Sequence, residues 1–243
     1  MTLRISLDKA YYRQPTHVFN LPAGWTCPWA VNCLTKADKD TGKLTTRPDK
    51  DKDGNPVTTI GGHDTYVCYA ARAERFPGVR ESRWKNFEEA RRMVWNGDYI
   101  DLPKGTTHVR VHGSGDFYSQ DYFDWWIEQA RANPGVTFWA FTKSVRYWVN
   151  RLGDIPANLH LTASVGGKDD DMIATHGLKT ATVFHDLDDV PADMMVDLDD
   201  WEAQDSNRPS FALLENMSNK NQGGDDRIAA HNARAAALQG TAC

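Results

Sequence analysis

The chain has 243 residues, of which 40% are hydrophobic, so it is long enough to bury one large core. Lys and Arg number 28 against 33 Asp and Glu, and the net charge of -5 gives no electrostatic reason to expect nucleic acid as the main partner. No apolar run approaches the roughly 20 residues that cross a bilayer, and the polar N-terminus is unlike a secretory signal. We therefore expect a soluble cytoplasmic protein with no membrane partner.

The first part of the chain predicts one strand, a polar insertion and two helices. THVFNLPAG at 16–24 is typical of a strand followed by a turn, and the stretch 36–63 is too rich in Asp, Lys, Thr and Gly to pack a core. We interpret 36–63 as an insertion, with the pattern of a β-hairpin, outside the main fold. A helix is expected from Cys68, followed by a break at Pro77–Gly78 and a second helix from an N-cap at Ser82 to a stop at Gly97.

In the rest of the chain strands alternate with helices. Strands are expected at 108–117, 136–144, 159–167, 180–185 and 210–216, and helices at 119–135, 145–158, 171–177 and 225–240. Such alternation with short connections indicates right-handed crossovers and a parallel sheet. The predicted fold is a single α/β domain over 1–243, an open or partial (β/α) barrel of about six parallel strands.

Polar residues follow several of these strands, where the chemistry of parallel α/β folds collects. Gly113, Ser114, Gly115 and Asp116 follow the strand at 108, and their backbone N–H groups are suited to holding a phosphate or a carboxylate. A glycine-rich turn that only permits a tight bend is the structural alternative. His112 and His185 also end strands, where a single histidine is more often a hydrogen-bonded structural residue than a ligand.

The four cysteines are Cys27, Cys33, Cys68 and Cys243. In a reducing cytoplasm they favour metal binding or plain burial over disulfides. Zinc usually takes two close cysteine pairs, whereas this chain has one C-x5-C pair and no second pair. An iron–sulfur cube accepts more widely spaced ligands, and the first three cysteines are expected at one mouth of the sheet. Cys243 is either an accidental terminal thiol or the fourth ligand, and we favour the ligand.

These motifs together resemble a known superfamily. A strand that leads into a cysteine loop, CYA at the start of a helix, and VRVHGSGDF, FWAFTKS and LHLTASVGG at strand ends resemble the radical SAM superfamily over about residues 16–185. The pattern is most similar to a family of phage proteins called gene product 88. The resemblance implies a bacteriophage source and the host cytoplasm as the location.

The resemblance also implies roles for individual residues. Cys27, Cys33 and Cys68 would ligate a 4Fe–4S cluster, with Cys243 in the fourth position as the sequence favours. The loop from Gly113 to Asp116 would line the methionine part of S-adenosylmethionine, and Lys143 and Ser164 would face the same cavity. Radical SAM enzymes place their cysteines in a compact C-x3-C-x2-C loop, but 34 residues separate Cys33 from Cys68 in this chain.

Three functions remain open from the sequence. The favoured one is a 4Fe–4S cluster protein with full cysteine ligation, used for electron transfer, for sensing or for binding a host or phage protein. The second is a radical SAM enzyme that cleaves S-adenosylmethionine. The third is a nucleic-acid-processing protein with a structural cluster and a local basic patch, formed by Arg72, Arg75, Arg80, Arg83, Lys85, Arg91 and Arg92.

Overall fold

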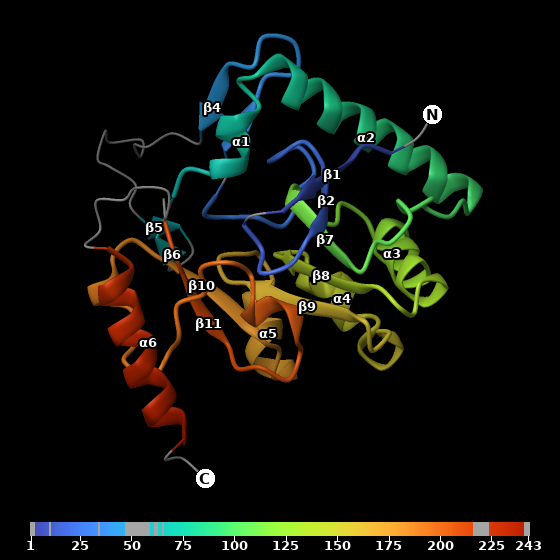
Figure 1. Cartoon of the computed structure of the whole chain (residues 1–243). Helices are drawn as coiled ribbons and strands as arrows, with labels where there is room; N and C mark the ends of the chain where they lie inside the picture. The colour runs from blue at the N-terminus through green and yellow to red at the C-terminus, as the bar shows by residue number, and fades with distance from the viewer. Residues whose placement is uncertain are drawn as a thin grey trace.

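An open, mostly parallel sheet forms the centre of the protein (Figure 1). The computed structural model describes residues 3–9, 11–33, 35–46, 59–60, 63–64, 66–215 and 224–240. The seven strands lie in the order β1-β2-β7-β8-β9-β10-β11, with β1 and β11 at the edges. Their bounds are β1 Ile5–Asp8, β2 Thr16–Asn20, β7 His108–Ser114, β8 Thr137–Thr142, β9 Leu159–Ser164, β10 Thr180–Phe184 and β11 Phe211–Leu214.

The strands from β2 to β11 pair in parallel and follow one another in chain order, whereas β1 pairs with β2 antiparallel. The predicted α/β class and the predicted parallel sheet are therefore confirmed. The sequence did not predict β1, whose side chains are largely exposed or half-buried, because an edge strand needs no apolar alternation.

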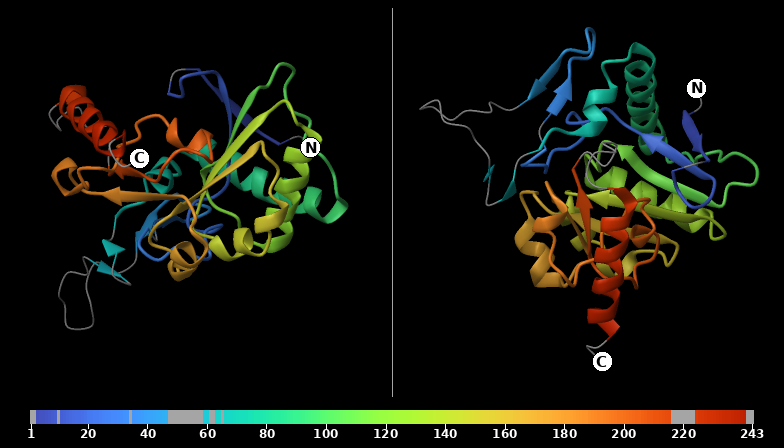
Figure 2. Two further views of the ribbon diagram at one scale, coloured as in Figure 1. Left: turned by 90° about the horizontal axis from the view of Figure 1, so that it is seen from below. Right: turned by 60° about the vertical axis from the view of Figure 1, so that its left-hand side comes forward.

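Helices cover one face of the sheet (Figure 2). They are α2 Pro77–Asn96, α3 Gln120–Ala132, α4 Val145–Val149 and α5 Asp170–His176. The main core lies between these helices and the strands, and α3 contributes most of its large side chains, including Trp126 and Phe123. Helix α6, Gly224–Gly240, packs at the β11 edge, where Ile228 joins an apolar cluster with Leu214.

The opposite face of the sheet is covered differently. Trp139 and Phe211 point from their strands to this side and pack with Tyr12 and with Ala203 of the short helix η3, Glu202–Gln204. We call this side the η3 face. The ends of β7 and β9 contact the segment that leaves β2 and carries Cys27 and Cys33.

Small elements lie between β2 and α2. The strands β3 Thr35–Ala37 and β4 Leu44–Thr46 form an antiparallel hairpin, in agreement with the hairpin expected in the polar insertion. A second pair, β5 Thr59–Ile60 and β6 His63–Asp64, precedes the five-residue helix α1, Tyr69–Ala73, with Cys68 at its N-cap. The remainder of the insertion, 47–58 with 61 and 62, is outside the described residues.

Two helix predictions were wrong. Helix α2 begins at Pro77 and not at Ser82, because proline is well suited to the first turn, where its missing N–H costs nothing. The helix expected at 145–158 ends after Val149 and continues only as the short η1, Leu152–Asp154, since Gly153 and Pro156 disfavour a continuous helix. The predicted cap at Ser119 and the predicted stop at Gly97 are confirmed.

Within the described part of the chain, no helix is both long enough and apolar enough to cross a membrane.

Candidate functional site

The loop that carries Cys27 and Cys33 crosses the ends of two strands. It leaves β2 and reaches the β9–α5 loop, where Val31 N–H donates to the Gly166 carbonyl over 3.0 Å and Lys168 N–H donates to the Trp29 carbonyl over 2.9 Å. In the sheet β7 and β8 lie between β2 and β9. The cysteine loop therefore spans the carboxyl ends of β7 and β8, the edge at which ligands of parallel sheets bind.

Cys68 joins this loop through its neighbours in sequence. Tyr66 N–H donates to the Asn32 carbonyl over 3.1 Å, and the Tyr66 hydroxyl hydrogen-bonds to the Cys33 thiol. The backbone N–H groups of Ala70 and Ala71 hydrogen-bond to Cys68, and Gly24 N–H donates to the Cys27 sulfur over 3.4 Å.

All three cysteines are free thiols. Burial raises the pKa of Cys27 well above its usual value, and the charges of Asp116, Cys33 and Cys68 raise it further. Burial raises the pKa of Cys68 to about 11, again with a contribution from Cys33. Each thiol thus lies within electrostatic range of the other two. The fold brings Cys68 near Cys27, although 41 positions separate them in the sequence.

Lys143 supplies a buried cation beside these thiols. Only 5% of the residue is exposed, and its ammonium donates to the carbonyls of Ser164, over 3.2 Å, and of Val165. Burial lowers the pKa of Lys143, while Cys33 and other nearby anionic groups oppose that shift. An ammonium has three N–H groups, so the third N–H of Lys143 donates to no acceptor among the described residues. Ser164 therefore contributes a carbonyl to this arrangement.

The glycine-rich loop after β7 packs tightly against the start of the cysteine loop. Ser114 and Leu21 exchange two hydrogen bonds of 2.8 Å, one from the Ser114 hydroxyl and one from the Leu21 N–H. A Cβ on Gly115, which has a φ of +88°, would lie 2.6 Å from Thr26 Oγ1, and one on Gly113 would lie 2.6 Å from Val18. The glycines permit this close approach, which accounts for them without a bound ligand.

Asp116 ties the ends of β7 and β8 together. Its carboxylate accepts hydrogen bonds from Phe117 N–H over 2.7 Å, from the Thr142 hydroxyl over 2.6 Å and from Lys143 N–H over 2.8 Å. Burial raises the pKa of Asp116 to about 6 despite these bonds. Its direct partners are all protein groups, and its charge still acts on Cys27.

The sequence did not single out the pair that fastens the cysteine loop to α1. Glu74 is fully buried, and one carboxylate oxygen accepts from Ala23 N–H over 2.7 Å and from Arg83 over 2.8 Å. Arg83 also donates to the Ala70 carbonyl over 2.6 Å. From the sequence alone, Glu74 and Arg83 are expected on the solvent-exposed side of helices, because charged residues are seldom buried. Only the fold shows that they pair in the interior.

A family model described as gene product 88 matches residues 3–238. The chain belongs to this family. Membership makes it a bacteriophage protein, in agreement with the resemblance noted from its motifs. No curated protein and no solved structure matches the chain.

The fourth cysteine of this family member, Cys243, is outside the described residues. Helix α6, which precedes it, runs away from α1 toward the opposite end of the molecule (Figures 1 and 2). Among the residues that the structure describes, three thiols lie within electrostatic range of one another at the site. Among these described residues, no group of three or more His, Cys, Asp and Glu side chains could hold a single metal ion.

The two histidines considered from the sequence lie elsewhere. His112 hydrogen-bonds to the Tyr122 hydroxyl over 2.9 Å in the main core, and burial lowers its pKa to about 3, so it is neutral. His185 contacts Glu215 over 2.6 Å at the β10–β11 end of the sheet. Neither residue contributes to the cysteine site.

The arginines between 72 and 92 do not form one exposed patch. Arg80 and Arg83 are buried, and Arg80 donates to the carbonyls of Lys39, Glu74 and Asp40. Arg92 pairs with Glu89 over 2.7 Å and with Asp98 over 3.0 Å. Much of the predicted basic patch therefore holds the β3–β4 hairpin and α2 in place.

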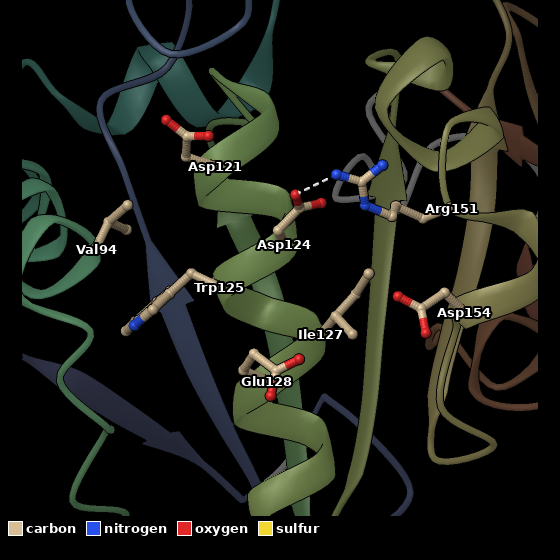
Figure 3. Close-up of a pocket in the computed structure, with 8 residues that line it drawn as sticks. All are labelled: Val94, Asp121, Asp124, Trp125, Ile127, Glu128, Arg151 and Asp154. Carbon is tan, nitrogen blue, oxygen red and sulfur yellow. Dashed lines mark hydrogen bonds and ion pairs between the residues drawn. The ribbon is translucent and has the colours of Figure 1, made fainter.

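A surface pocket of about 380 Å³ lies away from the cysteines, between α3 and the α4–η1 segment (Figure 3). Its walls include Trp125 and Ile127 of α3, and Asp124 pairs across it with Arg151 over 2.6 Å. It contains none of the residues predicted as a site. We therefore place the candidate site at the cysteines.

Proposed function

We propose that Cys27, Cys33 and Cys68 hold a 4Fe–4S cluster. The observation that carries the proposal is the convergence of three free thiols from two segments, the loop after β2 and the start of α1, at the carboxyl edge of a parallel sheet. Backbone N–H groups bond to two of the sulfurs, and such bonds stabilise thiolates and tune cluster potentials. The Lys143 ammonium offsets part of the negative charge that thiolates bring.

The spacing of the thiols fits a cube better than a single ion. A zinc ion binds sulfur at about 2.3 Å, which draws all its ligands around one centre. No described group is that compact. In a 4Fe–4S cube each thiolate binds a different iron. The cube can therefore bind thiols that lie within electrostatic range of one another but are not in contact.

The fourth iron is available to a small molecule when three cysteines bind. We propose that this molecule is S-adenosylmethionine and that the chain is a radical SAM-like enzyme. Six parallel strands in chain order support a partial-barrel relationship with that superfamily. When bound and reduced, such a cluster supplies one electron to the sulfonium of the cofactor. In this chain the unused N–H of Lys143 is available to a ligand carboxylate.

The other residues near the site act by positioning. Gly113 to Asp116 hold the loops after β2, β7 and β8 together through bonds to Leu21, Thr142 and Lys143. Ser164 orients Lys143 through its carbonyl. A cluster-dependent nucleic-acid enzyme is less well supported, because Arg80 and Arg83 are buried.

The experiment compares the wild type with Cys243→Ser after anaerobic reconstitution. If the proposal holds, both proteins carry equal iron and sulfide, and both bind S-adenosylmethionine with a change in the electron paramagnetic resonance of the reduced cluster. Loss of iron in Cys243→Ser, together with no cofactor binding by the wild type, would instead indicate full cysteine ligation. The protein would then serve electron transfer, sensing or the binding of a host or phage protein.

A further inference from the structure

The pocket between α3 and the α4–η1 segment combines apolar side chains with acidic ones (Figure 3). Val94 of α2 and Trp125 and Ile127 of α3 supply its apolar surface. The acidic side chains that line it are Asp121, Asp124, Glu128 and Asp154. Its volume of about 380 Å³ is large enough for a ligand group.

Carboxylates outnumber cations at this pocket. Arg151 pairs with Asp124 over 2.6 Å, and Arg131, just outside the pocket, pairs with Glu128 and with Asp154. Two arginines thus balance two of the four carboxylates, which leaves two negative charges in excess. Asp121 is exposed and forms no ion pair within the described part of the chain. The pocket therefore attracts a cation.

An exposed tryptophan adjoins the pocket. Trp95 follows Val94, which lines the pocket, and it is 90% exposed. Among the described residues, no other large hydrophobic side chain is as exposed as Trp95. Tryptophan carries a large apolar surface that is usually buried in a core or an interface. Contact with a partner would cover this surface.

The segment after α2 is fixed against α3 beside the same pocket. The Trp125 indole donates to the Asp98 carbonyl over 2.7 Å, and Ile100 N–H donates to Gln129 over 2.8 Å. Tyr99, between these two contacts, is 59% exposed. The end of α2 and the segment after it thus present two exposed aromatic side chains next to the acidic pocket.

Charge and shape decide which kind of ligand this surface suits. A Lys or Arg side chain has a cationic head and an apolar stem, so the stem can pack on Trp125 while the head lies near Asp121. A cation also binds favourably over the face of a tryptophan ring. Exposed aromatic side chains beyond the pocket favour a protein over a small cation, because Trp and Tyr are enriched at protein interfaces.

We propose that this pocket, together with Trp95, is a docking surface for a basic segment of another protein, with a Lys or Arg side chain of that segment in the pocket. The proposal goes beyond the cluster function and does not depend on it, because none of these residues belongs to the cysteine site. The charge of the partner follows from the excess of carboxylates, and its size follows from the exposed aromatic side chains.

The test measures the binding of a short, dye-labelled peptide of alternating lysine and alanine by fluorescence anisotropy. The protein is used as purified, with its iron content recorded. A peptide with glutamate in place of lysine and unlabelled spermidine serve as separate probes. We expect saturable binding of the lysine peptide that weakens as salt is added, no binding of the glutamate peptide, and much weaker binding of spermidine.

Two variants challenge the surface. Trp95→Ala and Asp121→Asn should each weaken binding of the lysine peptide by about fivefold or more, and both replace exposed side chains that the fold does not need. Phe76→Ala, at the opposite end of α2 and 63% exposed, and Asp193→Asn, at an exposed carboxylate after β10, are the controls and should bind as the wild type does.

Several outcomes would overturn the proposal. They are failure of the wild type to bind the lysine peptide, wild-type affinity in either Trp95→Ala or Asp121→Asn, an equal loss of binding in the controls, and spermidine binding as tight as that of the peptide. The last result would identify a small polyamine as the occupant. None of these outcomes depends on whether iron is present, so they are distinct from a failure of the cluster proposal.

Discussion

The carboxylate of Glu74 accepts a hydrogen bond of 2.7 Å from the backbone N–H of Ala23. This contact joins helix α1, which follows Cys68, to the loop that leads to Cys27. Arg83 completes it with an ion pair of 2.8 Å to the same carboxylate oxygen. The geometry of the cysteine site therefore depends on an ion pair that lies entirely in the interior.

Glu74→Gln should lower the free energy of unfolding by about 3 kcal/mol, since removal of one partner leaves a buried Arg83 charge uncompensated. Urea unfolding measures the change. Glu88→Gln is the matched control, because Glu88 pairs with Lys39 at the surface and should change stability by less than about 1 kcal/mol. Equal stability of the two variants would show that the buried pair does not hold the site.

Gly115→Ala should displace the cysteine loop. The added Cβ would lie 2.6 Å from Thr26 Oγ1 and 2.7 Å from Leu21 Cβ, at a φ that alanine rarely adopts. We expect a lower melting temperature and less iron bound after reconstitution. Gly153→Ala is the control, because a Cβ there meets nothing within 4 Å. A Gly115→Ala protein with full iron content would mean that the close approach of the two loops is not needed.

Much of the architecture follows from local sequence pattern, and the reasons are visible in particular residues. Ser119 and Gly97 mark helix ends with side-chain and backbone properties that act locally, so they are predictable. The strand ends at Lys143 and Asp116 meet because parallel strands place their carboxyl ends at one edge. The same rule places the loop with Cys27 and Cys33, which follows β2, at that edge. It does not place Cys68, which follows no strand of the main sheet.

Other features could not be predicted from the sequence. Arg110 between two buried valines of β7 signals a buried partner, but nothing local identifies Asp200 as that partner. The roles of Ser114 and Asp116 also depend on the fold, since only the structure shows that protein groups use both side chains. Sequence pattern gives the position of a polar residue, whereas its hydrogen-bond partners come from tertiary packing.

In the cluster-free protein Cys27 and Cys68 should react slowly with iodoacetamide at neutral pH. A raised pKa keeps a thiol protonated, and only the thiolate reacts. The rate at Cys68 should rise as the pH approaches its pKa of about 11, compared with about 8.5 for an ordinary thiol. Mass spectrometry of the labelled peptide measures the profile. Half-maximal reaction near the ordinary value would contradict the burial of this thiol.

Lys143→Met should lower the reduction potential of the reconstituted cluster. Its ammonium lies near Cys33 and Cys27 and favours the more negative, reduced form, so its removal favours the oxidised form. Lys168→Met is the control, because Lys168 is exposed and bonds to the Pro28 carbonyl, where solvent screens its charge. A redox titration that shows the same potential for Lys143→Met and the wild type would exclude this electrostatic role.

The most direct measurement is the iron and acid-labile sulfide content after anaerobic reconstitution, for the wild type and for a variant with serine at Cys27, Cys33 and Cys68. The proposed cluster predicts about four of each per wild-type chain and almost none in the variant. A wild type that takes up no sulfide, or a variant that retains as much iron as the wild type, would contradict the assignment of these thiols as cluster ligands.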